Sequence, residues 1–303
     1  MAKHGLTLRL KTNSPLPGNY HPECDSTPEC GPENTRLYAS LIGILRWLVE
    51  LGRVDITCEV SMMSSYNTMP REGHLDHVIY MFSYLKCHHN SRLVLDPTYP
   101  DIDMESFERK NWKQFYGDLK ELLPSNAPRG IGKEFIIRAY VDADFAGDNL
   151  IRRSRTGSII MINNAPLYWF SKKQSSMETN SFGSEFVAMR QCCEYLKGLR
   201  YKLRMMGIPV NNPCFIFGDN KSVLWNTTVP DSMLKKKTAS VSYHFVREGV
   251  SSDEWRTTYI KTNDNPADIL TKNLPAGDNR YRKVRMCLYD INPKDDEFGR
   301  TNN

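Results

Sequence analysis

Residues 135–147 read Phe-Ile-Ile-Arg-Ala-Tyr-Val-Asp-Ala-Asp-Phe-Ala-Gly, a β-branched and aromatic run that leads into an acidic residue, Asp142. Residues of this kind favour extended backbone, so we predict a strand over Phe135 to Val141. Two similar runs follow, from Ser158 to Ile162 and from Leu167 to Phe170. The three runs predict an antiparallel meander.

Downstream of the meander the apolar spacing becomes helical. Apolar residues three or four positions apart predict a long helix from about Ser181 to Met206. The further elements that we predict are a strand from Cys214 to Gly218, a short helix after Asp219, a helix through Phe245, a strand from Arg256 to Ile260 and a final helix from about Pro266. The order βββαβαβα predicts an α/β fold with a mixed sheet over residues 133–290.

The chain before residue 133 has a different character. Residues 1–32 are rich in Pro, Gly and Asn and lack a periodic apolar run, which predicts an extended arm. Residues 33–132 begin with apolar residues at helical spacing and end in an irregular, acidic and Pro-containing linker around a short amphipathic segment, Trp112 to Leu123. We therefore predict a small, mostly helical domain before the α/β domain, and a polar tail over residues 291–303.

Bulk properties exclude several classes of protein. The 303 residues suffice for two domains with cores of their own. No stretch approaches the roughly 20 apolar residues that span a bilayer, and the amino terminus carries charges where a signal peptide is apolar. The eight cysteines are scattered, which is typical of reduced, partly buried thiols. We expect an intracellular protein without a membrane partner, cytoplasmic or, as the alternative, nuclear.

Four acidic residues hold the strongest functional signal: Asp142, Glu185, Asp219 and Asp268. Asp142 and Asp219 each follow a predicted strand, and if those strands are parallel neighbours both carboxylates leave the sheet at one edge, where ligands bind. Glu185 shares the apolar stripe of the long helix, and Asp268 opens the final helix. A buried carboxylate needs a cation or hydrogen bonds, so the set predicts a site for hard divalent ions.

Each acid also has an ordinary structural interpretation. Asp142 and Asp219 are acceptable turn residues, Asp268 is an acceptable helix cap, and Glu185 has a basic neighbour in Arg190. Their combined spacing and topology favour the metal site. Asp144 and Asp148 compete for the first position, and we interpret both as turn or surface acids.

Basic residues concentrate in the second region. Residues 133–290 contain 24 Lys and Arg against 16 Asp and Glu, whereas residues 1–132 contain 14 against 16. This imbalance favours a polyanionic partner, with a solubilising surface as the alternative. The candidate nucleic-acid contacts are Lys172, Lys173, Asn220, Lys235, Lys236 and Lys237. Trp169 and Trp225 are candidates for stacking on bases, although core packing is the favoured interpretation for Trp169.

A histidine-rich segment offers a competing metal site. His74, His77, Cys87, His88 and His89 are residue types that bind zinc, and His74 and His77 fall on one helical face. No second well-spaced ligand pair accompanies them. We therefore do not predict zinc.

Seven short motifs in order carry a specific resemblance. They are Tyr-Val-Asp-Ala-Asp-Phe-Ala-Gly (140–147), Arg-Ser-Arg-Thr-Gly (153–157), Trp-Phe-Ser-Lys-Lys-Gln (169–174), Gly-Ser-Glu-Phe-Val-Ala (183–188), Gly-Asp-Asn (218–220), His-Phe-Val-Arg-Glu (244–248) and Asn-Pro-Ala-Asp-Ile-Leu-Thr-Lys (265–272). Together they resemble the ribonuclease H (RNase H) domain of copia-type LTR retrotransposon polyproteins. Residues 38–43, 51–56 and 70–85 similarly resemble the thumb- or connection-like region after the polymerase palm. The resemblance covers about residues 15–290.

The resemblance implies an RNase H-like fold and endonucleolytic cleavage of the RNA strand of an RNA–DNA hybrid. Asp142, Glu185, Asp219 and Asp268 match the metal-binding Asp-Glu-Asp-Asp set of the family, which implies Mg²⁺ as cofactor, with Mn²⁺ as the alternative, in two-metal phosphodiester hydrolysis. Asp142 is preferred to Asp144 because it matches the position directly after the first strand.

Two departures from the family pattern matter. Lys-Thr-Asn-Asp (261–264) fills the loop where cellular ribonucleases H often carry a histidine, and the polymerase's Tyr-x-Asp-Asp motif is absent. We expect no DNA synthesis, an RNA–DNA hybrid as partner, and a polymerase domain in trans as a further candidate partner. The alternative is a truncated or repurposed retrotransposon fragment that binds nucleic acid or a protein without cutting.

Overall fold

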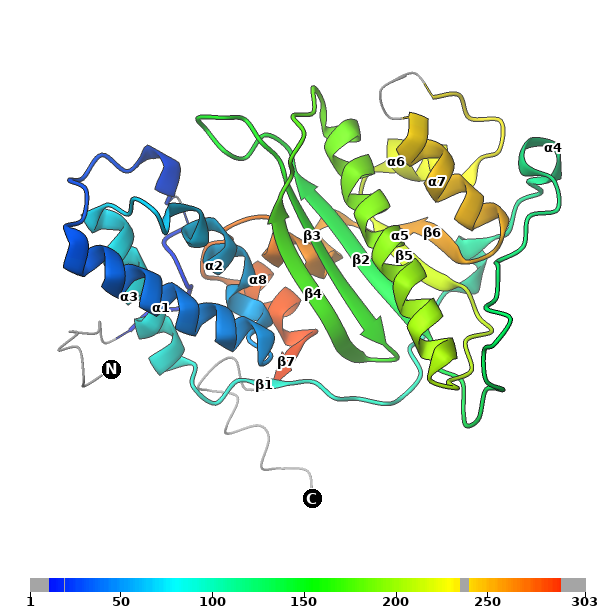
Figure 1. Ribbon diagram of the computed structural model, residues 1–303, viewed down its shortest axis with the longest axis horizontal. Coiled ribbons are helices and arrows are strands. Elements are labelled where there is room, and N and C mark those ends of the chain that lie inside the picture. The colour runs from blue at the N-terminus through cyan, green and yellow to red at the C-terminus, as the bar shows by residue number, and fades with distance from the viewer. Residues whose placement is uncertain (1–10, 19, 235–239, 290–303) are drawn as a thin grey trace.

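A mixed β-sheet lies at the centre of the molecule, which is a computed structural model that describes residues 11–18, 20–234 and 240–289 (Figure 1). Within these residues the sheet has five strands in the order β4-β3-β2-β5-β6. Their bounds are β2 Ile137–Asp144, β3 Arg155–Ile162, β4 Ala165–Lys173, β5 Cys214–Gly218 and β6 Trp255–Tyr259. The first three are antiparallel, whereas β2, β5 and β6 are parallel. The predicted α/β class is confirmed.

The long helix α5, Ser181–Met205, covers one face of this sheet (Figure 1). Asn180 caps its first turn by accepting a hydrogen bond from Gly183 N. Its buried stripe, which includes Met189 and Leu196, lies against small and β-branched residues of the sheet such as Ala139 and Val141. Two further helices, α6 Lys221–Thr228 and α7 Ser240–Ser251, complete this layer.

The end of the chain differs from the prediction. The expected final helix is a short 3-10 turn, η8 Pro266–Leu270, and after a loop the helix α8 begins, Asp278–Arg285. Asn265 explains the short turn: its side chain accepts from Ala267 N and donates to Val141 O, which holds η8 against β2. Pro275 and the positive φ of Gly277 keep the next residues out of a helix.

Three helices form a lobe beside the sheet: α1 Pro32–Glu50, α2 Thr57–Met63 and α3 Glu72–Cys87. They share an apolar core, and the Tyr38 hydroxyl donates to Met63 O at 2.7 Å to join α1 to α2. The described part of the predicted arm is tied to this lobe, with Leu16 fully buried and His74 hydrogen-bonded to Pro22 O. The predicted helical character of this region is confirmed.

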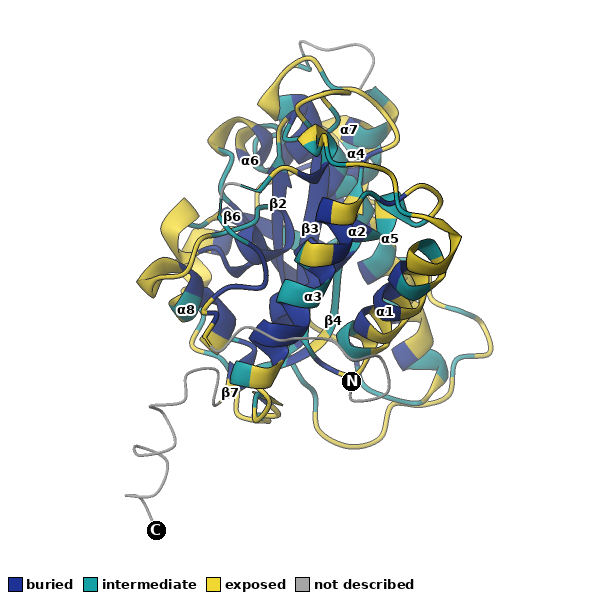
Figure 2. Ribbon diagram, turned by 90° about the vertical axis from the view of Figure 1, so that its left-hand side faces the viewer, coloured by how far each residue is buried: buried dark blue, intermediate teal, exposed yellow. Residues whose placement is uncertain are grey.

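The lobe and the sheet share one core. Buried residues, dark blue in Figure 2, occur both on the strands of the sheet and on the helices of the lobe. On the α2 side, Ser61 Oγ donates to Ser171 O at 2.8 Å and accepts from Arg155 at 2.7 Å. On the C-terminal side, Arg280 of α8 pairs with buried Glu59 at 3.0 Å. The short strand β7, Leu288–Tyr289, pairs with β1, Arg92–Leu93. The domain boundary near residue 132 therefore stays a prediction, since packing runs across it.

The linker forms less helix than predicted. It has one 3-10 turn, η5 Met104–Phe107, and one helical turn, α4 Lys113–Tyr116, in place of an amphipathic segment that continues to Leu123. Gly117, with φ of 66°, ends α4. Buried Phe107 packs edge-on against Phe215 and Phe217, so the linker adheres to the sheet by single aromatic anchors rather than by a helical stripe.

An ion pair holds the far end of the linker to α5. Glu121 accepts two hydrogen bonds from Arg200, at 2.8 and 2.7 Å, and two from Arg204. Arg200 is 2% exposed in its side chain, so it depends on this carboxylate for charge compensation. Burial alone would raise the pKa of the Glu121 carboxyl, but the hydrogen bonds and charges of both arginines lower it to about 2.

Among the described residues, no helix combines the length and the apolar character needed to cross a lipid bilayer.

We expect Glu121→Gln to lower the free energy of unfolding by about 3 kcal/mol, because it leaves a buried guanidinium without a counter-charge. Because the folded-state pKa of Glu121 lies below its ordinary value of 4.5, the wild-type contribution is present above pH 4.5 and is lost as the pH falls towards 2. Urea denaturation at a series of pH values measures both effects.

Glu108→Gln is the control, since Glu108 pairs with Lys110 at the surface with 69% of its side chain exposed. It should change stability by less than about 0.5 kcal/mol. Equal losses for the two variants would contradict the role given to Glu121.

Candidate metal centre

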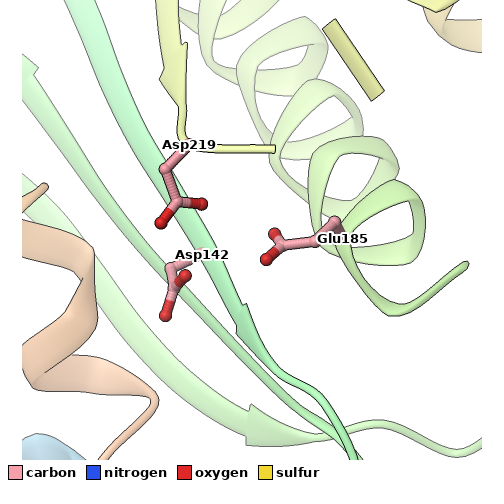
Figure 3. A group of neighbouring side chains, drawn as sticks. All are labelled: Asp142, Glu185 and Asp219. Carbon is pink, nitrogen blue, oxygen red and sulfur yellow. The ribbon is translucent and has the colours of Figure 1, made fainter. Parts of the chain in front are cut away.

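Three of the four predicted acids meet at one edge of the sheet (Figure 3). Asp142 is on β2 and Asp219 directly follows β5, and these strands are parallel neighbours with Tyr140 opposite Phe217. Because the two strands are parallel neighbours, both carboxylates emerge at the same edge of the sheet, as the sequence analysis predicted for that pairing. Glu185, from the second turn of α5, points at them, and one ligand oxygen from each of the three residues lies within 4.8 Å of the others.

The electrostatics of this cluster favour a cation. Asp142 is 1% exposed and Glu185 is 9% exposed. Burial, together with the charges of Asp268 and Asp219, raises the pKa of Asp142 to about 7, although Lys272 opposes this shift. Burial and the charges of Asp142 and Asp219 raise the pKa of Glu185 to about 10. Ionisation of three neighbouring carboxyl groups at a largely buried site is energetically unfavourable unless a positive charge binds among them.

The fourth predicted acid, Asp268, is placed differently. It lies on η8 and is buried, but it is not part of the group of three. Its Oδ1 accepts a hydrogen bond from Lys272 Nζ at 2.7 Å, and its Oδ2 accepts one from Lys283 Nζ. Three of the four predicted acids therefore lie together, whereas the fourth, Asp268, is paired with two lysines.

Three further residues at this site were missed from the sequence. Thr271 Oγ1 donates to Asp142 Oδ2, and Lys272 Nζ lies 3.5 Å from the same oxygen. Burial alone would lower the pKa of Lys272, but attraction to Asp142 and Asp268 raises it above its usual range. Thr271 and Lys272 belong to the sequence motif around Asp268, so the motif could have identified them as residues of the site. Nothing in the sequence indicated Lys283.

Gly157 explains how η8 comes so close. It lies opposite Asp142 in the β2–β3 register, and a Cβ added there would lie 2.7 Å from both Leu270 Cβ and Thr271 Cγ2. A residue without a side chain is therefore required where η8 crosses β3.

The two competing acids have other surroundings. Asp148 accepts hydrogen bonds from Leu150 N and Ile151 N and pairs with Lys173 at 2.7 Å, as a turn residue does. Asp144 lines a cavity of about 340 Å³ beside the cluster, between the arm, α2 and the segment after β2. Burial raises the pKa of Asp144, which Lys272 and Arg155 partly oppose.

The candidate nucleic-acid contacts differ in exposure and in their contacts within the protein. Lys172 is exposed, whereas Lys173 is engaged by Asp148. Asn220 caps α6 by accepting from Ser222 N and Val223 N. Lys235, Lys236 and Lys237 lie outside the described residues. All six stay predictions.

The two tryptophans and the histidine-rich segment lie in different surroundings. Trp169 is partly buried against the core, as favoured, while Trp225 is 62% exposed. His74 bonds to Arg71 N and Pro22 O, and among the described residues no group of three metal-binding side chains forms in the histidine-rich segment.

The strand order, the covering helix and the acids at the ends of parallel strands define an RNase H-like mixed α/β fold. The chain is similar in sequence to several polyproteins of transposons. It is 26% identical over 237 residues to the retrovirus-related Pol polyprotein from transposon RE1 of Arabidopsis thaliana, covering 78% of this chain and 14% of that protein. It is 27% identical over 249 residues to the corresponding polyprotein from transposon RE2, covering 82% and 15%. The predicted resemblance to copia-type polyproteins is confirmed, and the chain spans about one seventh of the length of these relatives.

The chain is also similar to solved structures of ribonucleases H. A crystal structure of LC11-RNase H1 in complex with RNA/DNA hybrid is similar at 15% identity and a TM-score of 0.37, covering 46% of this chain and 95% of that one. No protein-family model matches the sequence.

We expect Gly157→Ala to destabilise the protein by about 2 kcal/mol, because the new methyl group collides with η8. Gly198→Ala is the control: Gly198 is an exposed position of α5 with no atom within 4 Å of an added Cβ, so alanine there should be neutral or slightly stabilising. Thermal unfolding of both variants decides the matter, and equal midpoints would refute the close approach.

We expect Glu185→Gln to stabilise the metal-free protein by at least about 1 kcal/mol at mildly alkaline pH. The raised pKa of Glu185 means that its carboxylate, ionised in the unfolded chain, must take up a proton when the protein folds, whereas glutamine is neutral in both states. Adding Mg²⁺ should raise the unfolding temperature of the wild type but not of this variant. Glu194→Gln, an exposed change on the same helix, should behave like the wild type. Calorimetry in EDTA and in Mg²⁺ measures all three proteins, and an unchanged Mg²⁺ response in Glu185→Gln would contradict the assignment.

Proposed function

We propose that the chain hydrolyses the RNA strand of RNA–DNA hybrids in a reaction that depends on a divalent metal ion. The observation that carries this proposal is the convergence of Asp142, Glu185 and Asp219, each from a different element, to within 4.8 Å at the edge of an RNase H-like sheet. The polyprotein relatives support the choice of substrate, since reverse transcription of RNA generates hybrids. The excess of basic over acidic residues in 133–290 supports a polyanionic substrate.

The residues present fit a hard cation. All three converging ligands are carboxylates, which Mg²⁺ prefers, and Mn²⁺ accepts the same oxygen donors. Bound there, the ion would polarise the scissile phosphate and lower the pKa of the attacking water. Asp142 and Glu185 would hold it from the buried side, while the less buried Asp219 stands nearer the solvent. Thr271, which donates to Asp142, fixes the orientation of that carboxylate.

The direct test is cleavage of a hybrid with labelled RNA in Mg²⁺. We expect the wild-type chain to cut the RNA strand and Asp219→Asn to lose at least about two orders of magnitude in rate, as is typical when a group that stabilises transition-state charge is removed. Double-stranded DNA should remain intact.

Asp231→Asn is the matched control, because Asp231 is an exposed acid twelve positions further along. It should cut at the wild-type rate. Cleavage that survives Asp219→Asn, or that proceeds in EDTA, would contradict the proposed centre and point to a contaminating nuclease.

A second candidate function is binding of nucleic acid or of a protein partner without cleavage. One observation favours it: both oxygens of Asp268 accept hydrogen bonds from lysines, so the fourth carboxylate is engaged within the protein. Tight binding of hybrid by the wild type and by Asp219→Asn, with no cutting by either, would support this alternative. A polymerase domain in trans stays a prediction.

A further inference from the structure

Lys272 occupies a position of special interest for metal binding. Its Nζ is 2.7 Å from Asp268 Oδ1 and 3.5 Å from Asp142 Oδ2, so one ammonium bridges two carboxylates. The side chain is about one-third exposed, whereas Asp142 and Asp268 are almost completely buried. The positive charge thus enters a buried acidic gap from the solvent side.

The groups around Lys272 hold it there. Lys283, 2% exposed in its side chain, donates to the other oxygen of Asp268 and to Thr262 O at 3.0 Å. The buried ammonium of Lys283 therefore holds Oδ2 of Asp268, and Oδ1 of the same carboxylate accepts the hydrogen bond from Lys272. Asp142 is fixed in turn by Thr271.

The acidic centre is consequently asymmetric. In the group formed by Asp142, Glu185 and Asp219, Lys272 contacts Asp142 only, and among the described residues the other two carboxylates form no ion pair. The gap between Asp142 and Asp268 already contains a positive charge, and two cations a few ångströms apart repel each other strongly in a buried site.

We propose that Lys272 is an internal cation that competes with divalent metal for the gap between Asp142 and Asp268. The native chain then binds one divalent ion tightly at the group of three, and a second ion binds only by displacing the lysine. This inference rests on the proposed function, which it deepens by assigning a residue that controls the number of metal ions bound.

The test counts Mn²⁺ ions on the full-length chain by the electron paramagnetic resonance signal of free Mn²⁺, with isothermal titration calorimetry for the affinities. We expect one tight site in the wild type and two in Lys272→Met, with the second site strengthened at least about tenfold. Lys272→Gln, which keeps a hydrogen-bond donor but no charge, should give the same result and replaces the methionine variant if that one does not fold.

Two further variants separate local competition from a general change in charge. Lys261→Met removes an exposed lysine from the segment before η8 and should bind Mn²⁺ like the wild type. The double variant Lys272→Met/Asp268→Asn should lose the gained site, because the carboxylate that the lysine had covered is then absent.

The outcomes are distinguishable. Two equally tight sites in the wild type, or the same gain in Lys261→Met as in Lys272→Met, would overturn the competition and leave the proposed metal centre intact. Absence of any tight Mn²⁺ site in the wild type, with Asp219→Asn unchanged from it, would overturn the metal centre and the competition together.

Discussion

Acidic side chains converge at a buried edge of the sheet, and this electrostatic constraint governs how the segments around them pack. Parallel pairing of β2 with β5 brings Asp142 and Asp219 to one edge, and α5 delivers Glu185 to the same place. Like charges in such a place repel and resist ionisation, so the fold has to supply compensation from within or take a cation from solution. Lys272 and Lys283 supply part of that compensation, on the side of Asp268.

Close packing around η8 is what makes this compensation possible. Asn265 ties the start of the turn to Val141, and the missing side chain of Gly157 lets the turn lie against β3. Thr271 and Lys272 then come within reach of Asp142. The same segment joins the sheet to the helical lobe, because Ile269 and Leu270 lie in the core that both share. The segment 265–272 therefore contributes both to the acidic site and to the hydrophobic core.

Sequence reasoning recovered what local periodicity and strand order determine. The limits of β5 and the start of α5 were predicted correctly, because a short apolar run and apolar residues three or four positions apart are local signals. The meeting of Asp142, Glu185 and Asp219 followed from topology once the strands were taken as parallel neighbours.

Other features could not be read in this way, because partners distant in sequence decide them. The role of Asp268 stays a prediction, and its contact with Lys283 could not be foreseen, because Lys283 lies on a helix that has no periodic signal tied to η8. Trp112 to Leu123 has an amphipathic pattern, yet Gly117 ends the helix after one turn and Glu121 finds its partners on α5. A pattern records which residues prefer burial and leaves open which contacts satisfy them.

The pairing of Glu59 with Arg280 joins residues 221 positions apart, deep between the lobe and α8. During synthesis the helical lobe emerges from the ribosome before α8, so its buried carboxylate has no arginine partner until α8 has been made. The strand pair β1–β7 imposes the same order. Closing so long a loop is entropically costly, so the lobe can reach its final state only late. The helical lobe therefore completes its packing only when α8 and β7 have folded against it and its neighbours.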